Sequence, residues 1–119
     1  MRLLFYTPVS ESAGELLQKM IEELVSKDNV EVYRNIESLS RRLRQPANNQ
    51  PIAVLLAARK GDLLDIISIR DLLYNIRIIL VLPDRDADTI AKGHTLRPRF
   101  VSYTDSDFLD VCSVLRKML

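Results

Sequence analysis

Short apolar runs and amphipathic stretches alternate five times along this chain, and each pair predicts a strand followed by a helix. The strand candidates are residues 3–6, 30–33, 52–58, 77–82 and 99–103. The runs at 52–58 and 77–82 are apolar throughout, which is typical of central parallel strands covered on both faces. In the intervening segments apolar residues recur three and four positions apart, which predicts helices with one buried face.

Each predicted helix follows a side chain that can accept hydrogen bonds from free backbone N–H groups. Ser12 and Glu15 have the spacing of a capping box, and an apolar stripe runs behind them to residue 24. The other candidate caps are Asn35, before a helix that stops ahead of Gln45 and Pro46; Asp62, before a helix over residues 63–74; Asp86 or Asp88, before a helix around residues 89–92; and Thr104 or Asp105, before a terminal helix that reaches Leu119.

Five β-α units in this order predict an α/β fold. Short crossovers of this kind require a parallel sheet with helices on both faces, a (βα)5 three-layer sandwich. The expected strand order is 2-1-3-4-5, with the loops after strands 1, 3, 4 and 5 at one end of the sheet. The length of 119 residues predicts a single domain over residues 1–119.

Composition narrows the class of protein without naming a ligand. Hydrophobic residues make up 47% of the chain, charged residues 28%, and the net charge is +1, so no global charge favours nucleic acid or a membrane. The single cysteine, Cys112, cannot form an internal disulfide, and the short apolar run at the N-terminus predicts neither a signal peptide nor a membrane span. We expect a cytoplasmic protein.

In pattern and spacing, the whole chain resembles the receiver domain of bacterial response regulators. The resemblance implies an acidic magnesium-binding pair after strand 1 and a phosphoacceptor aspartate after strand 3. It also implies a threonine or serine after strand 4 and a lysine after strand 5. This chain instead has Thr7 and Pro8 after strand 1, Ala57 and Ala58 after strand 3, Pro83 after strand 4, and Ser102 and Tyr103 at the end of strand 5.

Phosphoryl transfer to a carboxylate needs a nucleophile, a divalent cation and a positive charge to hold the product. An alanine cannot be phosphorylated, and Thr7 and Pro8 carry no charge that would hold magnesium. The sequence therefore predicts a degenerate receiver-like domain without the aspartyl-phosphate switch. It contains no convergent catalytic set, so we expect no enzyme, no metal site and no cofactor.

The loop after the first strand also resembles the hydroxyl-rich phosphate loop of flavodoxins. Ser10, Ser12 and Gly14 would contact a phosphate there, at the start of a helix. Glu11 and Glu15 add negative charge, and the chain has no tryptophan to stack on a flavin. A nucleotide- or flavin-binding protein of flavodoxin-like fold is the alternative, and helix capping by Ser12 and Glu15 is the simpler interpretation.

Neither the acidic cluster nor the basic residues of the chain predict a ligand site. Asp84, Asp86 and Asp88 lack the glycine and glutamate that a calcium loop would need, so capping and solvation are expected. Nucleic-acid binding is not expected from the basic residues, which have no interleaved aromatics and no helix-turn-helix pattern. They form two groups, Arg34, Arg41, Arg42 and Arg44, and Arg97 and Arg99.

Apolar residues cover more of the third and terminal helices than packing on one sheet requires. Either neighbouring helices cover the excess, or it forms an interaction surface. By analogy with receivers, which often dimerise through their last elements, the terminal helix is the candidate interface. We expect a signalling or regulatory module that binds a protein partner or a second copy of itself through Phe108, Val111, Val114, Leu115 and Met118.

Overall fold

One parallel sheet organises the molecule, and its strands follow the predicted order. The computed structural model describes residues 2–8, 12–45 and 51–119, and the side chain of Ser12 is outside the described set. The strands are β1 (Leu3–Tyr6), β2 (Val30–Tyr33), β3 (Ile52–Leu56), β4 (Arg77–Leu82) and β5 (Phe100–Tyr103). They pair in the order β2-β1-β3-β4-β5, with every pair parallel, so the predicted α/β class and topology are confirmed.

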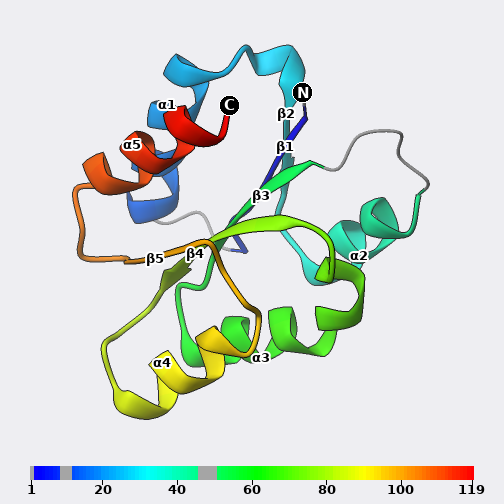
Figure 1. Ribbon diagram of the computed structural model, residues 1–119, viewed down its shortest axis with the longest axis vertical. Coiled ribbons are helices and arrows are strands. Elements are labelled where there is room, and N and C mark those ends of the chain that lie inside the picture. The colour runs from blue at the N-terminus through cyan, green and yellow to red at the C-terminus, as the bar shows by residue number, and fades with distance from the viewer. Residues whose placement is uncertain (1, 9–11, 46–50) are drawn as a thin grey trace.

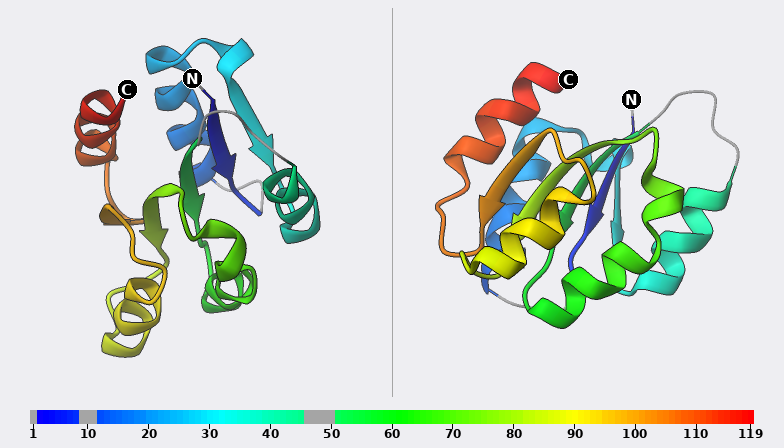
Figure 2. Two further views of the ribbon diagram at one scale, coloured as in Figure 1. Left: turned by 45° about the vertical axis from the view of Figure 1, so that its right-hand side comes forward. Right: turned by 60° about the horizontal axis from the view of Figure 1, so that its bottom comes forward.

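Helices cover both faces of this sheet, as Figures 1 and 2 show. Helices α1 (Ser12–Leu24) and α5 (Leu109–Met118) pack on one face. The other face carries α2 (Ile36–Arg44), α3 (Lys60–Ser68) and α4 (Ala87–His94). Two short 3-10 segments, η1 (Lys27–Asn29) and η2 (Arg70–Leu73), complete the connections.

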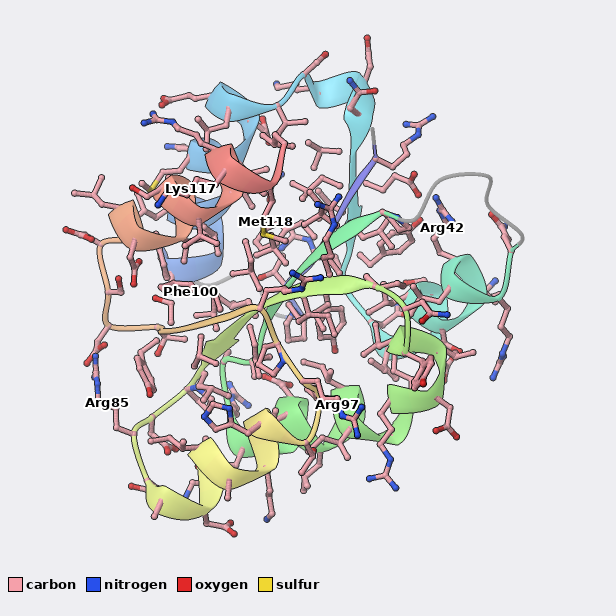
Figure 3. All side chains as sticks on the ribbon, in the orientation of Figure 1. Arg42, Arg85, Arg97, Phe100, Lys117 and Met118 are labelled. Carbon is pink, nitrogen blue, oxygen red and sulfur yellow. The ribbon has the colours of Figure 1, made fainter. Side chains whose placement is uncertain are left out.

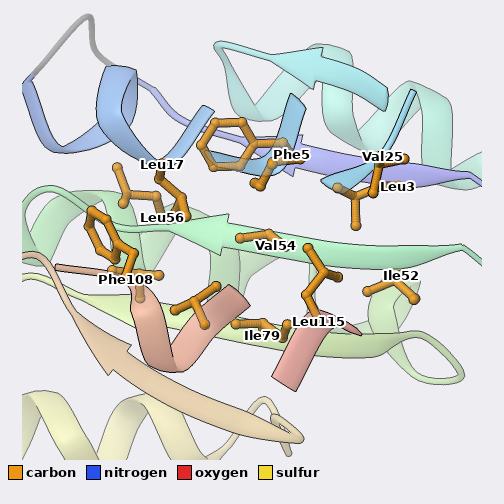
Figure 4. Packing of buried hydrophobic residues seen from close by; sticks show 13 residues of the cluster. Leu3, Phe5, Leu17, Val25, Ile52, Val54, Leu56, Ile79, Phe108 and Leu115 are labelled. Carbon is orange, nitrogen blue, oxygen red and sulfur yellow. The ribbon is translucent and has the colours of Figure 1, made fainter. Parts of the chain in front are cut away.

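The sheet separates two hydrophobic clusters because successive strand residues point to opposite faces. In β1, Leu3 and Phe5 face α1 and α5, whereas Leu4 and Tyr6 face the other three helices. The same alternation runs through β3 and β4, whose side chains are buried on both faces, apart from the half-buried Arg77. Figure 4 shows the first cluster, in which Phe108 and Leu115 of the C-terminal segment meet Val54 and Leu56.

The third helix differs from the prediction at both ends. It begins at Lys60 and ends at Ser68, and residues 70–73 form the 3-10 segment η2. The break turns Leu73 into the core, where Leu63 and Ile66 are also buried. Neighbouring elements therefore cover most of the apolar excess of this segment, and Leu64 is its exposed exception.

The terminal helix begins five residues later than the earliest predicted cap, Thr104. The backbone N–H of Thr104 donates to the carbonyl of Leu82 at 3.0 Å, which keeps this residue at the sheet. Phe108 then adopts a left-handed backbone with φ of 63°, a conformation that costs roughly 1–2 kcal/mol for a residue with a side chain. Its ring is fully buried, and burial of a phenylalanine contributes about 1.5–3 kcal/mol, which offsets the cost.

The predicted interface on the terminal helix needs correction. Phe108, Val111 and Leu115 are fully buried against the sheet and cannot form a docking surface. Val114 and Met118 are half-buried and pack against the same cluster. The outward face of α5 instead exposes Leu109, whose relative accessibility is 63%.

The different burial of two leucines on α5 gives a direct test of this packing. Leu115→Ala is expected to lower the free energy of unfolding by about 2–4 kcal/mol, because it leaves a cavity in the first cluster. Leu109→Ala is the matched control and should stay within about 0.5 kcal/mol of the wild type. Urea denaturation measures both. Equal losses for the two variants would contradict the placement of α5.

Candidate functional site

The carboxyl ends of the strands meet at one edge of the sheet, where ligands usually bind in folds of this class. Sheet hydrogen bonding continues for one residue beyond three of these strands. The backbone N–H groups that extend it belong to Thr7, which donates to the carbonyl of Tyr33 at 3.0 Å; Ala57, which donates to that of Val81 at 2.9 Å; and Thr104, which donates to that of Leu82 at 3.0 Å.

The residues predicted to replace receiver chemistry lie at this edge. Thr7 and Ala57 are completely buried, and Ser102 is nearly so. The others are half-buried: Pro8, Ala58, Pro83 and Tyr103. Four strands thus bring hydroxyl, methyl and proline side chains to the positions where the predicted resemblance would place acids and a lysine.

The carboxylate closest in sequence to the end of β3 caps the following helix. Asp62 Oδ2 accepts hydrogen bonds from the N–H groups of Ala58 at 3.1 Å and Arg59 at 3.0 Å. Asp62 is therefore in the first turn of α3 and not before it, which corrects the predicted start. Its carboxylate holds the backbone at the position where a phosphoacceptor loop would turn.

Two ion pairs connect the loops at this edge. Lys60 Nζ lies 2.7 Å from Asp86 Oδ2, which joins the loop after β3 to the loop after β4. Arg85 pairs with Asp105, which joins the loop after β4 to the loop after β5. The Arg85 guanidinium also lies 4.2 Å from the ring centre of Tyr103. These exposed pairs contribute little stability individually, but each engages a charge that could otherwise bind a ligand.

The pKa values at this edge follow from these contacts. The hydrogen bond to Asp86 raises the pKa of Lys60, and the hydrogen bond from Arg85 lowers the pKa of Asp105. The nearby Thr89 hydroxyl and the N–H of Asp86 lower the pKa of Asp84. The charged forms of all three groups are therefore favoured at neutral pH.

The loop between β5 and α5 is ordered by a second set of polar contacts. The Ser102 hydroxyl donates to Asp110 Oδ2 at 3.2 Å, and the Ser106 hydroxyl donates to Asp110 Oδ1 at 3.4 Å. Ser106 Oγ also accepts from the N–H of Phe108 at 3.0 Å. Ser102, at the end of strand 5, thus bonds to the first turn of the terminal helix.

The three aspartates after β4 form a turn contact and ion pairs instead of the expected helix cap, because Asp86 occupies the N-cap position of α4 without a side-chain cap hydrogen bond. Asp84 accepts from the N–H of Asp86, and Asp86 pairs with Lys60. Asp88 pairs with Lys92 one helical turn later, at 2.9 Å. Within residues 2–8, 12–45 and 51–119, no three His, Cys, Asp or Glu side chains form a group that could hold a metal ion.

The flavodoxin-like loop is only partly described. Ser10 and the side chain of Ser12 lie outside the described residues, and Gly14 is buried in the first turn of α1. The capping and phosphate-binding interpretations of this loop both stay predictions. In the described segments, no helix has the length and apolar character to cross a membrane.

A second polar cluster lies on the edge strand β2, and the sequence pattern gave no reason to expect it. Glu31 accepts hydrogen bonds from Arg42 Nε at 2.7 Å and from the Tyr33 hydroxyl at 2.6 Å. Arg2 Nε lies 3.7 Å from the same carboxylate. Partial burial alone would raise the pKa of Glu31, but the bonds from Arg42 and Tyr33 hold it below the usual range.

These contacts join residues that are distant in the sequence. Lys60 and Asp86 are separated by 26 positions, and Glu31 and Arg42 by 11. The predicted strand order makes the loops after β3 and β4 neighbours, and this is the sequence signal that could have indicated the pair of Lys60 and Asp86. Nothing in the helical pattern of residues 36–44 indicates that Arg42 turns toward β2.

Comparison with known proteins identifies no relative: no protein-family model, curated protein or solved structure matches this chain.

The Glu31 cluster predicts a pH-dependent contribution to stability. Glu31→Gln is expected to lower the free energy of unfolding by about 1–2 kcal/mol at neutral pH, because charge-assisted hydrogen bonds are lost. The pKa of Glu31 is lower in the folded than in the unfolded chain, so its contribution is present above the unfolded-state value and disappears as the pH falls through the folded-state value.

Denaturation of wild type and variant, from neutral pH to below the ordinary glutamate pKa of 4.5, measures this difference. The gap between the two proteins should shrink as the pH falls. Glu37→Gln, at an exposed site on α2, is the control and should show no gap. A gap for Glu31→Gln that stays constant across this range would contradict the charge-assisted contact.

Proposed function

We propose that this protein is a non-catalytic, phosphorylation-independent receiver-like signalling module that acts by protein–protein contact. One observation carries the proposal. At the edge of the sheet where a receiver performs phosphotransfer, the substituted positions hold no carboxylate, and the surrounding charges pair with one another.

Each requirement of aspartyl phosphorylation lacks its group in this chain. The nucleophile position has the methyl groups of Ala57 and Ala58, and the magnesium-binding positions have Thr7 and Pro8. At the position of the product-binding cation, Ser102 bonds to Asp110 and Tyr103 stacks with Arg85. A domain of this kind would present one constant surface to its partner.

The outer face of the α1–α5 pair supports a contact surface. Leu16 on α1 and Leu109 on α5 have relative accessibilities of 45% and 63%. Both lie near the starts of two helices that pack side by side, as Figure 1 shows. A contiguous apolar patch marks a protein-binding surface, whereas single exposed leucines are ordinary, so the self-association test below decides what these two leucines do.

The alternative is a small phosphate-containing ligand bound over the loop at Ser10 to Ser12. A thermal-shift screen with nucleotides and flavins separates it from the leading proposal. Stabilisation by such a ligand, lost in Ser12→Ala, would favour the alternative, after allowance for about 1 kcal/mol from the helix cap itself.

Phosphorylation by a small donor tests the absence of the switch. After incubation with magnesium and acetyl phosphate, the intact mass of the protein should be unchanged, because no carboxylate occupies the acceptor position. A working receiver domain, treated in parallel, should gain one phosphoryl group. A stable phosphate adduct on any aspartate of this chain would contradict the proposal.

A second copy of the chain is the first partner to test. Light scattering should show the mass rising with protein concentration for the wild type. Leu109→Asp should abolish the rise, because it places a charge on the exposed face of α5. Leu64→Asp is the matched control and should retain the rise, because it places the same charge at an exposed leucine of α3, on the opposite face of the sheet. A wild-type mass that stays monomeric at every concentration would exclude self-association as the contact.

A further inference from the structure

A groove runs between the edge strand β2 and helix α2, away from the ends of the central strands. Its volume is about 640 Å³, within the range of ligand-binding clefts. Three arginines line it together with Glu31, Tyr33, Ser38 and Gln45. Among the described residues that line the groove none is aliphatic, so an apolar ligand would gain little from them.

The charge of the groove favours an anion. Arg2, Arg41 and Arg42 contribute three positive charges and Glu31 one negative charge, which leaves a net charge of +2. The Glu31 carboxylate is already engaged by Arg42 and Tyr33, so it is oriented toward the protein's own donors. Arginine guanidinium groups also match phosphate oxygens in pairs, which lysine cannot do.

The hydrogen bonds within the groove show which donors remain available to a ligand. The Tyr33 hydroxyl donates to Glu31, and the Ser38 hydroxyl donates to the carbonyl of Asn35. Arg41 and Gln45 are exposed, and their side chains have no hydrogen-bond partner among the residues that the structure describes. Arg2 donates to the carbonyl of Asp28 at 2.6 Å and its Nε lies 3.7 Å from Glu31, but its side chain is 54% exposed, so its remaining N–H groups face the solvent side of the groove.

We propose that the β2–α2 groove binds a small phosphate-bearing ligand. Arg41 and Arg2 bind the phosphate oxygens, and Gln45 supplies a neutral donor. The contacts among Glu31, Arg42 and Tyr33 hold the floor of the groove in place before the ligand arrives. This assignment gives the arginines of α2 a role beyond that of a solvated helix face.

The shape and lining of the groove favour a small ligand over a macromolecule. A peptide would need apolar pockets for its anchoring side chains, and the described lining residues form none. A single-stranded nucleic acid would need several aromatic faces for stacking, and of the lining residues that the structure describes Tyr33 alone is aromatic. A phosphate group needs only the donors that are present.

The site is separate from the edge of the sheet on which the proposed function rests. Figure 3 shows Arg42 and Arg85 on opposite sides of the molecule. The two proposals can therefore fail independently. An unchanged mass with acetyl phosphate does not test ligand binding in the groove. Binding of a phosphate ligand in the groove does not test the absence of the phosphorylation switch.

Titration with inorganic pyrophosphate, followed by the backbone amide spectrum in NMR, tests the site. The amides of residues 31–33 and 38–45 should shift in a saturable way. Arg41→Gln should weaken binding by about tenfold. Arg97→Gln, which removes an exposed arginine from the turn after α4, is the matched control and should bind as the wild type does.

A second variant and a second probe complete the experiment. Arg2→Gln should weaken binding on the strand side of the groove, and it replaces Arg41→Gln if that variant loses the folded spectrum. Unchanged spectra, equal affinity for wild type and Arg41→Gln, or equal shifts around Arg97 and Arg99 would overturn the proposal. So would an oligonucleotide that binds the groove when pyrophosphate does not, since this would indicate a nucleic-acid surface.

Discussion

Burial of both faces of the parallel sheet is the constraint on which the rest of the structure depends. Parallel strands need long crossovers, which α1 to α4 provide, and together with the terminal helix α5 they cover the sheet on both sides. Because β1, β3 and β4 are buried on both faces, neither face can offer a ligand site. Polar chemistry is restricted to the ends of the strands, the edge strands and the outer faces of the helices.

The polar groups are used differently at two of these places. At the carboxyl ends of the strands, ion pairs connect neighbouring loops: Lys60 with Asp86, and Arg85 with Asp105. The Asp62 carboxylate caps the helix that follows β3. Along β2, at the edge of the sheet, Glu31 holds Arg42 and lies 3.7 Å from Arg2, while Arg41 remains exposed. The charges at the carboxyl edge therefore have structural roles, and exposed arginines lie beside the edge strand.

The sequence predicts this architecture well where burial has a local pattern. The apolar runs that form β3 and β4 and the Asn35 cap, which accepts from the N–H of Ser38 at 2.8 Å, are confirmed. Prediction fails where contacts over long distances decide the outcome. The start of α5 depends on the left-handed backbone of Phe108 and on hydrogen bonds to β4, and the Glu31 cluster depends on the packing of α2 beside β2. Short-range periodicity carries no information on either.

The central claim is that the carboxyl edge of the sheet has one arrangement that phosphoryl chemistry does not alter. The most direct measurement is the backbone amide spectrum in the presence of magnesium and beryllium fluoride, a mimic of the aspartyl phosphate. We expect the amide signals of Thr7, Ala58, Lys60, Asp86 and Thr104 to stay unchanged. Saturable shifts confined to these loops would show that the edge still binds the phosphoryl mimic, and would contradict the central claim.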